Sequence, residues 1–338
     1  MIVHMSTTGS APPRRTGGMV PSAELLPDVL PTDRLTATGL PAPGLRSELR
    51  RIDDLRNAGT VALAWLQAAV TIGLAVWIAH PLGYLAAVVF MGPVFARFAI
   101  IGHEAAHKLL FTNKRINDTV GRWLVAYPAF VPLDIYRRGH FAHHKEEFGP
   151  NEPDMNFYVD YPISRRSLRR KLVRDAVGIS GWKNLKPLLT SAVRPGPTRP
   201  IALRILGVQV VMLAGFTLAG RPELYLLLWL LPWMTTWRVL NRLRSIAEHG
   251  GMEASDDRRR TTHHVRQSWL ANFWIVPLNT GWHLAHHVDM GVPWRNLPQL
   301  HGELVDAGWV TPELEYPSYR ALWRALASGG ATEPVQPR

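Results

Sequence analysis

Residues 60–79 form an uncharged run of apolar and small side chains that constrains the fold more than any other stretch. A helix of about twenty such residues spans the hydrocarbon core of a bilayer. Three further apolar runs follow at 82–101, 201–219 and 223–240, and only Arg97 interrupts the first of these. Backbone polar groups inside a bilayer must be satisfied within the protein, so these runs predict helices. The sequence therefore predicts an all-α integral membrane protein with four transmembrane helices.

The placement of basic residues predicts the orientation of these helices. The links between runs one and two and between runs three and four are short and contain only Arg221, whereas 137–200 and 238–266 are rich in Arg and Lys. Basic loops remain on the cytoplasmic side of the cell membrane. We therefore expect two helical hairpins, both termini in the cytoplasm, and a cytosolic helical cap. The net charge of +12 accompanies no nucleic-acid-binding motif, so we expect no nucleic acid partner.

Three regions are expected along the chain. Residues 1–57 are predicted to be a disordered, basic N-terminal tail, because their first part is rich in Pro, Gly, Ser and Thr. Residues 58–310 are predicted to be the membrane domain, and 311–338 a C-terminal helix and tail. Within the domain, 119–135 is interpreted as an interfacial or re-entrant segment. The stretch 163–175 is interpreted as a basic amphipathic helix, either on the membrane surface or solvated.

Nine histidines in three boxes and one isolated position carry the chemistry. Two boxes have a His-x-x-His-His pattern, and spacings of three and four residues place side chains on one helix face. The chain has no cysteine, so a metal would be bound by histidine and carboxylate. One ion cannot take nine imidazoles, which makes a dinuclear site the leading interpretation. The candidate ligands are His103, His107, His140, His143, His144, His249, His283, His286 and His287.

Two other interpretations remain open for these histidines. The first box, His-Glu-Ala-Ala-His at 103–107, matches the zinc-protease pattern of two histidines and a glutamate base. A membrane zinc protease would nevertheless leave the other two boxes without a role. A metal transporter would carry its ligands near the bilayer midplane, whereas these boxes lie at or beyond the ends of the apolar runs.

The order and spacing of the boxes among the apolar runs resemble the membrane fatty acid desaturase superfamily. The resemblance covers about residues 60–305 and includes HEAAHKLLFTNKRINDTVGRW, GHFAHHKEEFGPNEPDMN and the region from AEHGG to PLNTGWHLAHHVDMGVPWRNLP. It implies that the nine histidines bind two non-haem iron ions that activate O₂. Some members also carry an asparagine four residues before the isolated histidine, where this chain has Ser245.

The resemblance implies a desaturase that introduces a double bond into a fatty-acyl or lipid substrate at the cytoplasmic face. A hydroxylase or ketolase of the same superfamily, acting on a carotenoid, sphingoid base or secondary metabolite, is the alternative. No cysteine cluster, flavin-binding or haem-binding pattern is present, so electrons must come from outside. We expect a ferredoxin or a cytochrome b5-like donor with its reductase.

Further residues are candidates for supporting roles. Metal-bound imidazoles commonly donate their second N–H to a carboxylate, and the candidate partners are Glu104, Glu152, Asp154, Glu248 and Asp289. Each has a surface carboxylate as its simpler interpretation. The candidates for an apolar substrate channel are Trp233, Trp237 and Trp282, although tryptophan also favours membrane interfaces.

The remaining histidines are not expected to bind metal. His263 and His264 follow a charged run and are predicted to lie in a solvated loop, so His263→Ala should be nearly neutral. His80 falls in a hairpin turn, His301 is distant from the third box, and His4 lies in the tail. By contrast, replacing His144 or His286 with alanine should abolish turnover.

Overall fold

The computed structural model describes residues 15–150 and 152–329 of the chain. Their secondary structure is helical apart from two isolated bridges and two short strands, β1 (His264–Val265) and β2 (Glu315–Tyr316), which pair in parallel. The ends of the predicted tails, 1–14 and 330–338, lie outside the described residues. The sequence prediction of a mainly helical protein is confirmed.

The first two apolar runs form a helical hairpin of α2 (Asp54–Ile78) and α3 (Pro81–Ala106). Asp53 caps α2 by accepting a hydrogen bond from a backbone N–H of the first turn. His80 caps α3 in the same way through Nδ1, and Pro81 occupies the first turn, where its missing N–H has no cost. Both helices agree with the sequence prediction, and His80 lies in the hairpin turn as expected.

The third run forms one long helix, α9 (Arg199–Leu218), but the fourth run is divided. It contains α10 (Glu223–Tyr225), the π-helix η3 (Leu226–Leu230) and α11 (Leu231–Met234). Pro232 lacks the N–H that would bond to the preceding turn, and Thr235 leaves helical geometry at φ −119° and ψ −84°. Three helices of the described residues are therefore long and apolar enough to cross a membrane: α2, α3 and α9.

After the bend, the chain continues as α12 (Thr236–His249). The bend is packed against α8 (Ile179–Val193) at Gly181, where a Cβ atom would lie only 2.3 Å from the carbonyl oxygen of Met234. Only glycine permits this approach. The same contact places the first turns of α8 beside the start of α12.

The segment predicted to be interfacial or re-entrant forms α4 (Lys114–Val120), the π-helix η2 (Gly121–Ala126) and a turn before α5 (Leu133–Lys145). Indole N–H groups from the divided fourth run form hydrogen bonds with backbone carbonyls of the turn: Trp229 donates to the Pro128 carbonyl and Trp233 to the Ala129 carbonyl. Irregular backbone is tolerated near a bilayer where protein buries it in this way. The segment contains no helix among those long and apolar enough to cross a membrane in the described residues.

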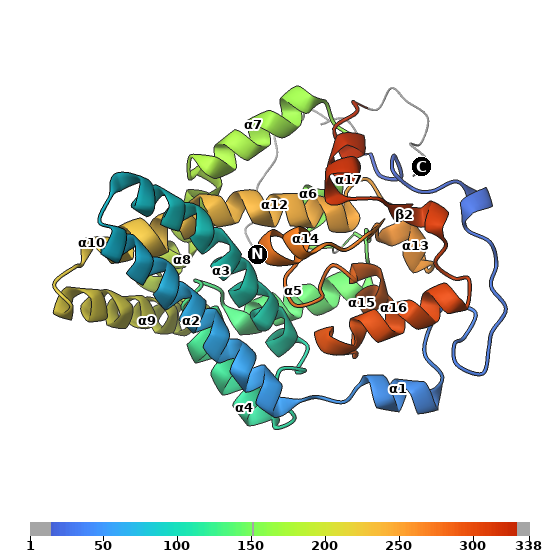
Figure 1. Cartoon of the computed structure of the whole chain (residues 1–338), viewed down its shortest axis with the longest axis horizontal. Helices are drawn as coiled ribbons and strands as arrows, with labels where there is room; N and C mark the ends of the chain where they lie inside the picture. The colour runs from blue at the N-terminus through green and yellow to red at the C-terminus, as the bar shows by residue number, and fades with distance from the viewer. Residues whose placement is uncertain (1–14, 151, 330–338) are drawn as a thin grey trace.

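Short helices make up the rest of the helical structure of the described residues. The predicted basic helix is α7 (Arg165–Ala176), and the others are η1 (Ala23–Leu25), α1 (Pro43–Leu49), α6 (Met155–Tyr158), α13 (Arg258–Thr261), α14 (Trp269–Trp274), α15 (His283–Val288), η4 (Trp294–Asn296), α16 (Leu297–Asp306), η5 (Pro312–Leu314) and α17 (Tyr319–Leu326). Figure 1 shows α2, α9 and α10 on one side of the molecule and α13, α15, α16 and α17 on the other. Helices α3, α5 and α12, which carry the other candidate histidines, lie between these two sides.

The N-terminal segment differs from its prediction. From residue 15 onward it follows the cap, and Leu35, Leu45 and Leu49 are buried in the main hydrophobic core. A few leucines that bury fully stabilise a segment whose composition is otherwise typical of disorder. The expected disordered tail over 1–57 is therefore not seen in residues 15–57.

Candidate metal centre

The nine candidate histidines gather where four helices meet. His103 and His107 stand at the end of α3, the second box ends α5, His249 ends α12, and the third box forms most of α15. Each of the nine side chains is at most 8% exposed. Segments separated by up to 184 positions, from His103 to His287, thus bring imidazoles into one buried cluster.

The cluster divides into two adjacent groups. The first group has five histidines whose ligand nitrogens all lie within 4.8 Å of one another: His103, His107, His140, His144 and His286. In the second group His143, His249 and His287 converge in the same way. His283 joins the second group, because its Nε2 lies 3.0 Å from the Nε2 atoms of both His249 and His287.

Helix geometry explains how the boxes are divided. Residues four apart share a helix face, and accordingly His140 and His144 belong to one group while His283 and His287 belong to the other. Adjacent residues point about 100° apart at 3.6 residues per turn. Each His-His pair is therefore split between the groups, and the rings of His144 and His287 stack across the boundary at 4.4 Å.

The distances between the ring nitrogens match those expected between nitrogens that bind the same metal ion. The Nε2 atoms of His107 and His140 are 2.8 Å apart, and those of His140 and His144 are 3.1 Å apart. Nitrogens about 2.0–2.1 Å from one ion, at right angles, would be about 2.9 Å apart. Both ring nitrogens of His103 are buried without any hydrogen-bond partner in the described chain. Such orphaned buried groups indicate a missing ligand, so the residues fit a metal centre.

The electrostatics keep these imidazoles neutral, as metal ligands must be. Burial holds the pKa of His140, His144 and His249 well below its usual value, and it does the same for the pKa of His283, His286 and His287. His143 is the exception. Burial lowers its pKa, but the facing carboxylate of Glu152 outweighs this effect and raises the pKa.

Two carboxylates orient imidazoles of the second group. Glu152, a sequence candidate, lies with Oε2 2.7 Å from Nδ1 of His143. Glu147, which sequence reasoning missed, lies with Oε1 2.6 Å from Nδ1 of His287. Glu147 follows His144 by three positions in the sequence, and this short spacing after the second box is the signal that could have identified it. Both hydrogen bonds aim the opposite ring nitrogen, Nε2, into the cluster.

The other four candidate carboxylates have different surroundings. Glu104 accepts a hydrogen bond from the backbone N–H of Trp294, and Glu248 pairs with Arg244 and lies 3.6 Å from Nδ1 of His283. Asp154 lines the cavity beside the centre. Asp289 does not pair with an imidazole as expected, because its two oxygens bind Arg46 of α1 and Arg50, which directly follows α1.

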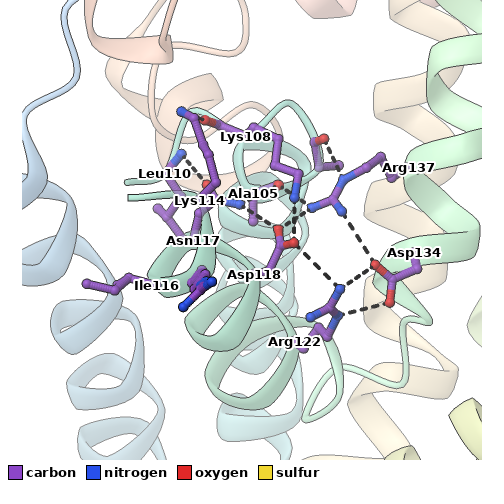
Figure 2. A network of polar contacts seen from close by, with 12 residues as sticks. Ala105, Lys108, Leu110, Lys114, Ile116, Asn117, Asp118, Arg122, Asp134 and Arg137 are labelled. Carbon is purple, nitrogen blue, oxygen red and sulfur yellow. Dashed lines mark hydrogen bonds and ion pairs between the residues drawn. The ribbon is translucent and has the colours of Figure 1, made fainter. Parts of the chain in front are cut away.

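A polar network at the end of α3 fixes the first box against the second, and sequence reasoning did not identify it (Figure 2). The guanidinium of Arg137 donates to the carbonyl oxygens of Ala105 and Ala106, both at 2.9 Å, and to Asp118 at 2.8 Å. Asn117 also donates to the Ala105 carbonyl. Because Arg137 precedes His140 on α5, one side chain joins the helices of both boxes.

A cavity of about 450 Å³ adjoins the cluster. Four candidate ligands line it: His140, His143, His249 and His283. Its apolar walls include Trp233 and Trp237, as the channel interpretation requires, while Trp282 lies elsewhere and stacks on His301 at 4.2 Å. Ser245 also faces this cavity, with Oγ donating to the Asn241 carbonyl.

The prediction of a solvated loop for His263 and His264 is wrong, because both side chains are only 5% exposed. His263 Nε2 donates to the Gly250 carbonyl at 2.8 Å, and His264 stacks on His301 at 4.7 Å. The charged run before them suggested solvent, but its arginines pair with acidic side chains, and Arg259 is itself buried along with the two histidines. Neither histidine belongs to the two metal-ligating groups of the described residues.

Comparison with known proteins identifies the family. A family model described as fatty acid desaturase matches residues 75–323. Dihydrorhizobitoxine desaturase of Bradyrhizobium elkanii is 26% identical over 233 residues, covering 64% of this chain and 65% of that protein. The sn-1 oleoyl-lipid 12-desaturase of Arthrospira platensis is 23% identical over 266 residues, covering 71% of each chain.

A chloroplast omega-6 fatty acid desaturase of Arabidopsis thaliana is 24% identical over 327 residues, covering 88% of this chain and 66% of that protein. The chain thus spans about two thirds of the length of the curated relatives it matches.

Proposed function

Because the chain belongs to the fatty acid desaturase family, we propose that it is an O₂-dependent desaturase of a fatty-acyl or lipid substrate. The division of nine buried imidazoles into groups of five and four carries the proposal. Two ions fit this division, and imidazole ligands suit iron. The zinc-protease alternative uses one ion and accounts for only one of the two groups.

Two iron ions bound here would activate O₂ and supply the oxidant for an unactivated C–H bond, which side-chain acids and bases cannot break. The protein supplies position. Glu147 and Glu152 hold two imidazoles of the second group in orientation. The apolar wall of the cavity, which includes Phe98 and Phe130, would hold an alkyl chain beside the ligands and exclude water.

We also propose the arrangement in the membrane. The hairpin α2–α3, helix α9 and the divided fourth run cross the bilayer as two hairpins, and the basic loops keep the metal centre and both termini in the cytoplasm. The reaction consumes electrons from outside the chain, from a ferredoxin or a cytochrome b5-like protein with its reductase. The absence of cysteine from the sequence supports an external donor.

Metal analysis and product analysis test the proposal. The purified chain should contain about two irons, and lipids of expressing cells should include products that have lost two hydrogens. His144→Ala should abolish this product, whereas His301→Gln, the matched change at a histidine outside both groups, should retain it. A product that gains one oxygen atom would instead identify the hydroxylase or ketolase alternative. One zinc per chain and no oxidised lipid would refute the proposal.

A further inference from the structure

We propose that Arg238 binds the anionic head group, a carboxylate or a phosphate, of an amphipathic substrate whose alkyl chain extends along α12 to the metal centre. This inference rests on the proposed desaturase function and specifies the substrate class. It is carried by the contacts of Arg238, by the face of α12 on which it lies, and by the separation of charge within the cavity.

Arg238 lines the cavity, is half-buried, and forms no ion pair within 4.0 Å among the described residues, while Asp175, the carboxylate that acts on it at longer range, is already paired with Arg242. Its Nε donates to the Trp233 carbonyl at 3.0 Å, and its guanidinium lies 4.1 Å from the centre of the Trp233 ring. These contacts fix the side chain but leave both terminal amino groups without a hydrogen-bond partner in residues 15–150 and 152–329. By contrast, Arg242 and Arg244 on the same helix pair with Asp175 and Glu248.

One face of α12 connects Arg238 to the metal ligands. Arg238, Asn241, Ser245 and His249 follow one another at spacings of three and four residues, which places them in one row. All four line the same cavity. Arg238 and His249 are eleven positions apart, and at 1.5 Å per residue the row is about 16 Å long. A zigzag of carbon–carbon bonds, each about 1.5 Å long, needs about a dozen bonds to cover this distance.

Charge is separated along the cavity. The two carboxylates that line it, Asp154 and Glu248, lie at the metal end, where Glu248 precedes His249 and the Asp154 backbone N–H donates to Glu152. Arg244 also lines the cavity at the metal end but pairs with Glu248, and at the opposite end Lys183 extends from the part of α8 that packs against Met234. Arg238 and Lys183 therefore attract an anionic head group to their end of the cavity, where the lining residues include no carboxylate.

The position of Arg238 relative to the apolar fourth run also favours a bound anion. Arg238 follows directly on the divided fourth run, and an ionisable group near membrane depth is costly unless it is paired or functional. A bound carboxylate or phosphate would accept hydrogen bonds from the free amino groups of Arg238, which match such oxygens in geometry. The alkyl chain would then lie against the apolar wall formed by Phe98, Phe130 and Trp237.

Calorimetric titration tests this inference on the full chain, loaded with iron, in nanodiscs of zwitterionic lipid, with empty nanodiscs to subtract partitioning. The probes are dodecanoate, dodecyl phosphate and methyl dodecanoate, which differ only in the head group. We expect at least one of the two anions to bind at least tenfold more tightly than the ester. Arg238→Gln should remove this preference, and Arg238→Lys should keep part of it.

Arg166→Gln on the exposed face of α7 is the matched control and should leave the preference unchanged. A preference for dodecanoate would indicate that the substrate is a free fatty acid. A preference for dodecyl phosphate would indicate a substrate with a phosphorylated head group. Equal binding of ester and anions, or an unchanged preference in Arg238→Gln, would overturn the inference. Iron content and product formation measured on the same wild-type samples report separately on the desaturase function, which stands if only the head-group preference is absent.

Discussion

Replacing Glu147 with glutamine should weaken one of the two metal sites selectively. The carboxylate of Glu147 is 1% exposed and bonds to Nδ1 of His287 at 2.6 Å and to Arg258 at 2.8 Å. Glutamine preserves the shape and one acceptor oxygen but removes the charge. His287 would lose a charge-assisted hydrogen bond, which is about twice as strong as a neutral one.

The expected loss follows from the position of Glu147. Changes to residues that orient a metal ligand typically reduce metal affinity about 10- to 100-fold, which corresponds to about 1.4–2.7 kcal/mol. Glu147 and Glu152 both form their imidazole hydrogen bonds to the second group. Glu147 also lies within 4.8 Å of His144 of the first group, but its hydrogen bond is to His287. The weakened ion should therefore be the one bound by His143, His249, His283 and His287.

Iron titration against a competing chelator measures this effect. Wild-type protein should retain about two irons, whereas Glu147→Gln should retain one tightly bound iron and release the other at 10- to 100-fold lower chelator concentration. Asp175→Asn is the matched control, because Asp175 is a buried carboxylate paired with Arg242 and distant from the imidazoles. It should lower stability without changing the iron affinity of the folded protein. If Glu147→Gln lowered the affinity for both irons equally, or changed the affinity for neither, the reasoning would be refuted.

Three further changes test other parts of the structure. Arg137→Gln removes hydrogen bonds to two α3 carbonyls and to Asp118. It should lower the free energy of unfolding by about 2–3 kcal/mol, measured by denaturant titration. Arg137→Lys should retain part of the stability that Arg137→Gln loses. His263→Ala should cost about 2–4 kcal/mol by the same assay, which replaces the near-neutral effect that the sequence predicted. Burial lowers the pKa of His263 to about 4 from 6.5; its stabilising contribution is present above pH 6.5 and is lost as the pH falls toward 4, because the unfolded chain binds the proton first. A pH series that is unchanged in His263→Gln would contradict this assignment. Ala99→Phe narrows the cavity and should raise KM for the longest substrate at least tenfold while sparing shorter ones; an unchanged chain-length profile of the products would show that the cavity does not hold the chain.

The sequence predicted the long helices because hydropathy reports a local property. A run such as 60–79 has one favourable conformation in a bilayer, whatever its neighbours are. The divided fourth run could not be predicted in this way. Its composition is as apolar as the others, but the bend at Thr235 depends on Pro232 and on the approach of Gly181 to Met234, which is a tertiary contact.

The candidate site was predictable to the level of residue type and spacing. The boxes indicated imidazoles on shared helix faces, but sequence could not assign each ring to a group, because that requires the mutual placement of α3, α5, α12 and α15. The wrong partner predicted for Asp289 has a physical cause. Asp289 lies close to the third box in sequence, but Arg46 and Arg50 occupy it, and these arginines belong to the segment that was expected to be disordered.

The His-x-x-His-His pattern itself explains why the imidazoles divide into two groups. A helix that carries histidines at positions one, four and five presents the first and fifth about 40° apart and turns the fourth about 60° from the first and 100° from the fifth. The second box follows this rule, with His140 and His144 in the first group and His143 in the second. The third box is placed the opposite way, since His283 and His287 enter the second group and His286 the first. Two such boxes facing one another each contribute a pair to one group and a single ring to the other. With His103 and His107 added to the first group and His249 to the second, the groups reach five and four ligands, so deleting His249 should affect the second ion before the first.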